Sequence, residues 1–134
     1  MKYILDTDTC IFALKQRMGV LRRLLQESPD DVAVSAMTQA ELRFGAMKSN
    51  HAEKAMTQVD AFLEPLTVLP FDSAAACKNA EFRYALRSNP IGERDLVIAA
   101  LAGSNQLTLV THNVSEFARI GVLNLEDWAE TNEC

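Results

Sequence analysis

Short apolar runs alternate along this chain with longer stretches in which apolar residues recur every three or four positions. The short runs are typical of strands buried on both faces of a parallel sheet, and the periodic stretches are typical of amphipathic helices. A chain that alternates strands with helices favours a parallel sheet, because each right-handed crossover lays its helix over one face. The sequence therefore predicts an α/β fold with helices on both faces of one sheet.

Turn residues and changes of period indicate where each element begins and ends. Strands are expected at Tyr3–Leu5, Val32–Ser35, Thr67–Pro70, Gln106–Thr111 and Val122–Leu125. Helices are expected as two short segments within 11–25, and at Thr38–Met47, 52–66, Ala74–Arg87, Glu93–Ala102 and Ser115–Ile120. The fourth strand alternates too little to be half exposed, so we expect it to be central and buried.

Polar residues at characteristic spacings indicate where several helices begin. Thr38 and Glu41 have the spacing of a capping box, so a helix is expected to start at Thr38 with Glu41 in its first turn. Asn50 and Glu53 repeat this spacing ahead of the next helix. Asp72 is a suitable cap for the helix that follows it.

The length and composition of the chain are those of a single domain. At 134 residues with 49% hydrophobic residues it can bury one core, and we expect one domain over residues 1–134. The longest nearly pure apolar stretch, Leu96–Gly103, is far shorter than the roughly 20 residues that span a bilayer. A secretion signal is not evident either. We therefore expect a cytoplasmic protein without a membrane segment.

The net charge and the cysteine content exclude some classes of function. The net charge of −5 and the pI of about 5.0 argue against indiscriminate binding along nucleic-acid phosphates, so any RNA contact needs a local basic surface. Cys10, Cys77 and Cys134 are odd in number and far apart, which fits neither a disulfide framework nor a zinc site. We expect them to be free thiols in a reducing compartment.

Four acidic residues stand where an α/β chain brings side chains together. Asp6 and Asp8 follow the first strand, while Glu41 and Asp95 are expected at the starts of two helices. Ligands bind at the carboxyl edge of open parallel sheets, and Asp6 would lie there beside the end of the fourth strand. Clustered carboxylates repel one another unless a cation compensates, and oxygen ligands favour Mg²⁺ or Mn²⁺.

The chemistry that such a site supports is hydrolysis of a phosphate ester by metal-activated water. The chain lacks the Gly-rich phosphate loop of nucleotide-driven enzymes and the Ser-centred elbow of acyl transferases. Its two histidines, His51 and His112, are far apart in sequence. His112 is expected to be a surface residue or to support a neighbour, because a catalytic histidine needs a partner.

Five short motifs resemble those of one family. They are Tyr3-Ile-Leu-Asp6-Thr7 with Ile11, Thr38-x-x-Glu41-Leu42 with Gly45, Pro90-Ile-Gly92-x-x-Asp95, Leu109-Val-Thr111-His-Asn113 with Glu116-Phe117, and Glu126-Asp-Trp128. In this order and spacing they look like a PIN-domain ribonuclease toxin of the VapC type. The resemblance covers nearly the whole chain and implies a three-layer α/β/α sandwich around a sheet of four to five parallel strands.

The resemblance also implies an activity and its partners. A protein of this type is a Mg²⁺- or Mn²⁺-dependent endoribonuclease, active as a homodimer and silenced by a VapB-type antitoxin. Its substrate looks like tRNA, with the anticodon region of initiator tRNA as the narrower expectation. By position, Asp6, Glu41 and Asp95 would form the acidic metal site, and Asn113 would complete the catalytic set.

Two residues depart from the family pattern. Asp8 stands where the family usually has Asn, and Asn113 stands where many members place a fourth acid. Glu116, one helical turn after Asn113, is a possible substitute acid. Thr7 and Asp8 are possible supporting residues. Side chains that could contact RNA phosphates are Arg83, Arg87 and Arg94.

Other interpretations stay open at the level of sequence. Each acid has an ordinary role available: Asp6 or Asp8 as a helix cap, Glu41 in a capping box, and Asp95 at the positive end of a helix. The pair Asp6 and Asp8 also fits the Asp-x-Asp motif of a haloacid-dehalogenase-like phosphatase. That class needs a second acidic pair directly after a late strand, and this chain has none there. A receiver-type signalling module is a poorer fit, because this chain lacks the acceptor Asp after the third strand and the Lys after the last strand that such a module requires. A catalytically weak PIN-like binding subunit is a further alternative.

Overall fold

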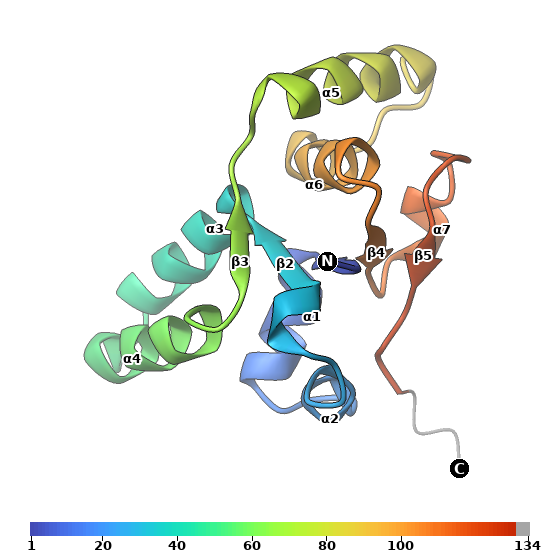
Figure 1. Ribbon diagram of the computed structural model, residues 1–134. Helices are drawn as coiled ribbons and strands as arrows, with labels where there is room; N and C mark the ends of the chain where they lie inside the picture. Colours follow the sequence, from blue (N-terminus) through green and yellow to red (C-terminus); the bar gives the residue numbers. More distant parts are fainter. Residues whose placement is uncertain (131–134) are drawn as a thin grey trace.

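Five parallel strands form one sheet at the centre of the computed structural model, which describes residues 1–130 (Figure 1). The strands are β1 Tyr3–Leu5, β2 Val32–Ser35, β3 Thr67–Leu69, β4 Thr108–Val110 and β5 Leu125–Glu126. Their order across the sheet is β3-β2-β1-β4-β5, so β1 is central and β4 is its neighbour. The predicted parallel sheet is confirmed, and so is the internal, buried position of the fourth strand, because β4 pairs with β1 on one side and with β5 on the other.

Helices cover both faces of this sheet. They are α1 Thr7–Leu14, α2 Val20–Leu24, α3 Ala36–Met47, α4 Ala52–Leu63, α5 Ser73–Ala85, α6 Glu93–Ser104 and α7 Val114–Phe117, with a 3₁₀ turn, η1, at Pro29–Asp31. In the described part of the chain none of them has the length and apolar character needed to cross a membrane.

Alternate residues of each strand point to opposite faces, and this divides the core in two. Ile4 and Leu109 pack in one cluster with residues of α5, α6 and α7, including Phe117. Their neighbours Leu5 and Val110 pack in the other, with residues of α1 to α4. Burial on both faces explains why the strands read as uninterrupted apolar runs. The three-layer α/β/α arrangement is therefore confirmed.

The start of α3 differs from the capping-box prediction. Ser35, the last residue of β2, is the N-cap, and its hydroxyl accepts a hydrogen bond from the Thr38 backbone N–H at 2.9 Å. The helix thus begins at Ala36, and Glu41 lies in its second turn. Ser is at least as good an N-cap as Thr, and Ser35 lies where β2 ends, so the helix begins directly after Ser35.

Several other boundaries also shift. The cap of α4 is His51, which makes no side-chain capping bond, whereas Asp72 caps α5 as predicted. Because α6 continues to Ser104, Gln106 forms a left-handed turn (φ 55°) and β4 begins only at Thr108. The last helix and strand occupy 114–117 and 125–126 rather than 115–120 and 122–125.

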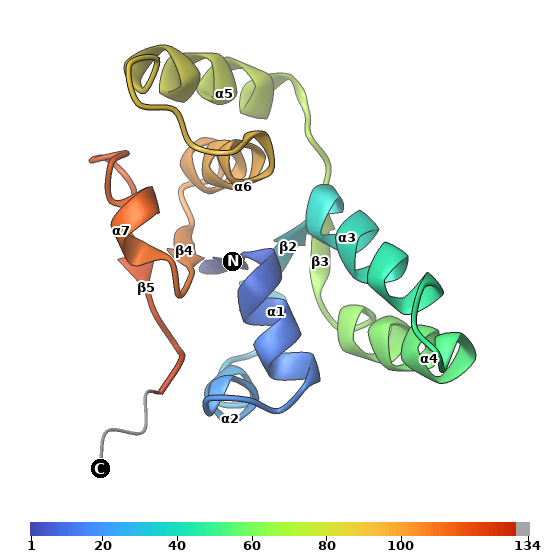
Figure 2. The same cartoon turned by 180° about the vertical axis from the view of Figure 1, so that it is seen from behind.

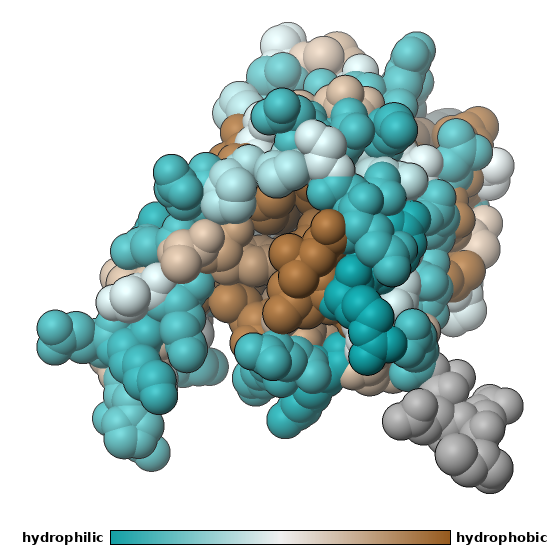
Figure 3. Space-filling view, turned by 60° about the horizontal axis from the view of Figure 1, so that its bottom comes forward, coloured by the Kyte–Doolittle hydropathy of each residue, from teal (hydrophilic) through white to brown (hydrophobic). Residues whose placement is uncertain are grey.

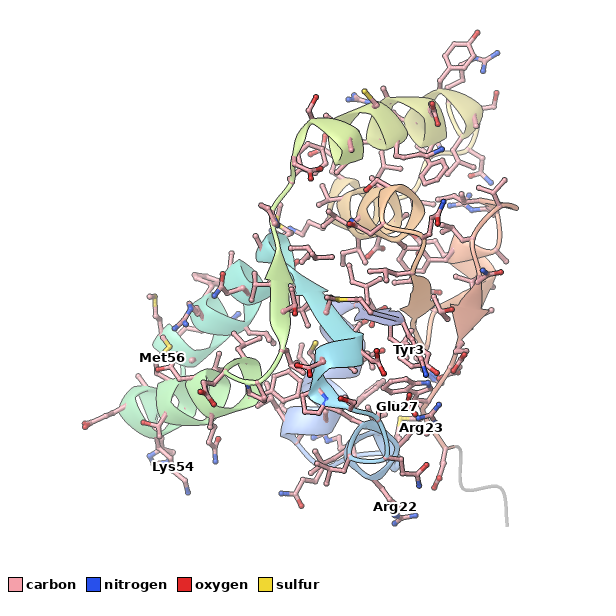
Figure 4. The ribbon with its side chains drawn as sticks, viewed as in Figure 1. Tyr3, Arg22, Arg23, Glu27, Lys54 and Met56 are labelled. Carbon is pink, nitrogen blue, oxygen red and sulfur yellow. The ribbon has the colours of Figure 1, made fainter. Side chains whose placement is uncertain are left out.

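The end of the described chain is held against α2 and β1 by Trp128. Its buried ring meets the Tyr3 ring edge-on at a centroid distance of 5.1 Å. The Arg23 guanidinium lies 4.5 Å from the Trp128 ring and 2.7 Å from the Glu27 carboxylate. Figure 4 shows Arg23 beside Tyr3 and Glu27. These contacts hold the segment that follows β5 against the face opposite α5 and α6.

Apolar side chains also remain at the surface. The most exposed large ones include Leu25, Phe44, Met47, Tyr84 and Val122. Figure 3 shows apolar side chains gathered near the middle of one face and surrounded by polar ones. Single exposed apolar residues are normal in soluble proteins, so only the continuous region is informative.

Replacing the cap of α3 should destabilise the protein. Ser35→Ala removes a buried hydroxyl that bonds Thr38 and should lower the free energy of unfolding by about 1 to 2 kcal/mol in urea denaturation. Ser28→Ala is the matched control, because Ser28 caps η1 without a side-chain hydrogen bond. Equal losses in both variants would contradict the assigned cap.

Candidate active site

Residues from three helix starts and one strand end line a hollow of about 430 Å³. Its lining is Asp6, Thr7, Asp8, Glu41, Gly92, Glu93, Arg94 and Asp95. Figure 2 shows α1 and α3 from behind, each beginning on the side nearest α6. Five acidic residues and one arginine therefore share one small space at the carboxyl end of β1, as the parallel topology predicts.

Asp6 is the most buried of these acids, with 4% of its surface exposed. One carboxylate oxygen accepts from the Thr9 backbone N–H at 2.8 Å, which caps α1, and the other accepts from the Thr111 hydroxyl at 2.6 Å. Burial raises the pKa of Asp6, while these hydrogen bonds oppose the rise. The residue is thus both a cap and a member of the acidic hollow.

Glu41 is held by two polar neighbours. Its Oε1 lies 3.5 Å from the Thr7 hydroxyl, and its Oε2 lies 3.4 Å from Nη1 of Arg94. Thr7 is in turn 3.0 Å from the Thr38 hydroxyl, which links the starts of α1 and α3. The Glu41 carboxylate therefore faces a positive charge of the same chain.

Asp95 has the most perturbed carboxyl group that remains partly exposed. It lies in the first turn of α6, and its pKa is raised to about 6. Partial burial is the largest cause of the raised pKa. The nearby Glu116 carboxyl is the next, and repulsion from Asp6 and Asp8 adds to it. The raised pKa shows that these acids are near enough to affect one another.

Glu116 lies near enough to Asp95 to raise its pKa, but neither Glu116 nor Asn113 lines the hollow. The Asn113 amide nitrogen donates to Glu116 at 2.5 Å, and the Asn113 backbone N–H donates to the Thr111 hydroxyl at 2.9 Å. Helix α7 therefore carries an acid whose charge acts on Asp95, and the role of Glu116 as a substitute for the missing fourth acid stays a prediction.

Several predicted residues are not brought to the hollow. Arg83 and Arg87 lie on or just after α5 and do not line it; the Arg87 guanidinium lies 3.9 Å from the Tyr84 ring centroid. His112 bonds Asp127 at 2.9 Å and is a surface residue, as expected. Of the three arginines suggested as RNA contacts, only Arg94 lines the hollow.

Sequence reasoning gave no separate role to Thr111, which is fully buried and bonds Asp6. Its place is a direct result of the parallel pairing of β1 with β4, whose register sets Leu5 opposite Val110 and hence Asp6 near Thr111. The sequence did contain a signal for this contact, because Thr111 directly follows β4 and Asp6 directly follows the neighbouring strand β1.

The acids share the hollow without being drawn tightly together. Among residues 1–130, no three Asp, Glu, His or Cys side chains already form a group that could hold a metal ion. Glu41 is turned towards Arg94, and Glu116 towards Asn113. Cys10 is buried, which raises the pKa of its thiol, and Cys77 is exposed; both are free, and Cys134 lies outside the described residues.

Comparison with known proteins identifies the family. The PIN domain matches residues 3–123. The chain belongs to the PIN-domain family. It is 37% identical to the Salmonella typhimurium protein named tRNA(fMet)-specific endonuclease VapC, over 96% of this chain and 98% of that protein. A protein of the same name from Shigella flexneri is 35% identical over 96% of this chain and 99% of its own length.

Solved structures agree with this PIN-domain assignment. The DNA-bound VapBC complex of Salmonella typhimurium contains a chain with a TM-score of 0.90 and 36% identity, covering 96% of this chain and 99% of that one. The Rickettsia felis VapBC2 complex bound to a promoter DNA fragment contains a chain with a TM-score of 0.87 and 34% identity, and the match covers 96% of this chain and 99% of that one. The chain therefore belongs to the VapC group of the PIN-domain family, and this membership replaces the phosphatase and receiver interpretations.

The raised pKa of Asp95 predicts a pH-dependent effect of its removal. Well below pH 3.8 Asp95 is protonated in both the folded and the unfolded chain, so the group has no effect. As pH rises from about 4 to about 6 the unfolded chain loses this proton before the folded chain does, which destabilises the fold, and the loss is complete above about pH 6. Relative to wild type, Asp95→Asn should therefore gain about 1 kcal/mol of unfolding free energy between pH 4 and pH 8, a value reduced for solvent screening.

Urea denaturation in EDTA across this pH range measures the gain. Asp30→Asn, at an exposed acid of η1, is the control and should show no such gain. A constant difference between Asp95→Asn and wild type at every pH would contradict the assigned repulsion.

Proposed function

We propose that this protein is the divalent-metal-dependent endoribonuclease toxin of a toxin–antitoxin pair. The observation that supports it best is the convergence of Asp6, Glu41 and Asp95 on one hollow, together with the raised pKa of Asp95. Acids that repel one another at a surface hollow favour a bound cation. Within this proposal residues 1–134 work as a single PIN domain in the cytoplasm.

The side chains of the hollow suit a hard divalent cation. All of the acids offer carboxylate oxygens, which are the ligands that Mg²⁺ and Mn²⁺ prefer. Asp6, Glu41 and Asp95 are the proposed ligands, with Asp8 and Thr7 as supporting residues. When bound, the ion would supply an activated water and would neutralise charge on a phosphate.

The chain's own residues prepare this site in distinct ways. The Thr9 backbone N–H and the Thr111 hydroxyl hold Asp6 in a single orientation before anything binds. Partial burial and repulsion from Glu116 raise the pKa of Asp95 to about 6, so Asp95 can hold a proton near that pH. We assign Asn113 to the catalytic set as the residue that orients Glu116.

We propose tRNA as the substrate and a VapB-type antitoxin as the partner, with the homodimer as the active form. The relatives named as tRNA(fMet)-specific endonucleases support the substrate, and initiator tRNA cut in its anticodon region is the narrower proposal. A groove of about 910 Å³ between α1, α3 and α4 supports the partner. Thr7, Glu41 and Arg94 line both this groove and the hollow, so a segment bound in the groove would reach the acids.

Neutralising a single acid of the hollow should abolish RNA cleavage. Asp6→Asn, Glu41→Gln and Asp95→Asn should each lower the rate of tRNA cleavage with Mg²⁺ or Mn²⁺ by at least about 100-fold, because each removes a proposed ligand charge. EDTA should have the same effect on wild type. Cleavage is measured on labelled tRNA, with thermal melting to show that the variants fold.

Glu81→Gln is the matched control, because Glu81 is an exposed acid on α5, outside the hollow's lining, that pairs with Lys78. It should cleave at the wild-type rate. Cleavage that persists in EDTA or in Asp95→Asn would contradict the proposal. A folded wild-type protein that binds its antitoxin but cleaves no RNA would instead favour the catalytically weak binding subunit.

The substrate is tested by sequencing the RNA ends that appear after the protein is induced in bacteria. The proposal predicts new ends in the anticodon region of initiator tRNA and few in elongator tRNAs. New ends spread across messenger or ribosomal RNA would contradict the tRNA assignment while leaving the nuclease assignment in place.

A further inference from the structure

Arg94 is the single basic side chain among the eight residues that line the acidic hollow. It lies between Glu93 and Asp95 in the first turn of α6, and it reaches across to α3, where its Nη1 lies 3.4 Å from Oε2 of Glu41. Because it also lines the adjoining groove, it stands at the rim that separates the two spaces.

The contact between Arg94 and Glu41 is easily exchanged for another. The Arg94 side chain is 71% exposed and that of Glu41 is 24% exposed, and the single contact is long for a charge-assisted hydrogen bond. Exposed ion pairs of this kind add little to stability. Arg94 can therefore leave Glu41 without disturbing the fold.

A phosphate that enters the hollow meets a strongly unfavourable field. Five of the eight lining residues are acidic, and the whole chain has a net charge of −5. A cation held by the acids offsets only part of this charge. Arg94 is the one positively charged lining side chain that can donate to a phosphate oxygen, and its planar guanidinium suits a phosphate well.

We propose that Arg94 exchanges partners during the reaction: it neutralises Glu41 when no divalent ion is bound, and it binds an RNA phosphate when one is. This inference rests on the proposed nuclease function. Its consequence is that Arg94 competes with the divalent ion for Glu41 in free protein but assists RNA binding in the loaded protein. Loss of Arg94 should thus have opposite effects on the two affinities.

The first measurement is the affinity for Mn²⁺ in the absence of RNA, determined by calorimetric titration. Arg94→Ala should bind Mn²⁺ about 2- to 5-fold more tightly than wild type, because a competing positive charge is removed from the hollow. Arg94→Lys keeps the charge and should bind Mn²⁺ nearly as wild type does.

The second measurement is tRNA cleavage at saturating Mn²⁺ over a range of salt concentrations. Arg94→Ala should raise KM about 10-fold with a smaller change in kcat, since it removes a phosphate contact rather than a proposed metal ligand. The slope of log KM against log salt should fall by about 0.7, which corresponds to one lost contact on single-stranded RNA. Arg94→Lys should restore part of the KM.

Arg22→Ala is the matched control. Arg22 is 75% exposed and lies 3.7 Å from one carboxylate, that of Glu130, but it lies on α2 and points away from the molecule in Figure 4. It should bind Mn²⁺ as wild type does and keep its KM and salt slope.

The inference requires both effects in Arg94→Ala. Unchanged or weaker Mn²⁺ binding would overturn it, and so would an unchanged KM and salt slope. These outcomes differ from a failure of the proposed function, in which wild type itself would neither bind Mn²⁺ nor cleave RNA.

Discussion

Repulsion among carboxylates at one edge of the parallel sheet is the constraint on which this site depends. The topology leaves the chain no alternative: β1 is central, so its end and the starts of α1, α3 and α6 meet. The fold tolerates the charge by different local means. Asp6 accepts two hydrogen bonds, Glu41 faces Arg94, and Asp95 holds its proton up to about pH 6.

These local solutions have different strengths, and the difference suits a nuclease. The bonds to Asp6 are short and buried, so this carboxylate is fixed. The contact of Glu41 with Arg94 is long and exposed, so it can change. A site with one fixed acid and one exchangeable acid can stay folded while empty and still accept a cation and a phosphate in turn.

Much of the fold could be predicted from the sequence, because short apolar runs and helical spacing are strong signals for an alternating chain. Asp6 and Asp95 could be placed because they follow a strand and open a helix. The cap of α3 could not, since Ser35 and Thr38 both suit the role and only the end of β2 decides between them. The pairing of Arg94 with Glu41 joins residues from distant helices, and no local pattern encodes it.

The central claim is that these carboxylates bind one divalent ion, and anomalous X-ray scattering from a Mn²⁺-soaked crystal tests it most directly. The account predicts an anomalous peak in the hollow, within ligand distance of Asp6, Glu41 and Asp95, with the Arg94 guanidinium displaced from Glu41. A hollow without a peak at saturating Mn²⁺, or a peak bound elsewhere with the contact of Arg94 and Glu41 intact, would contradict it.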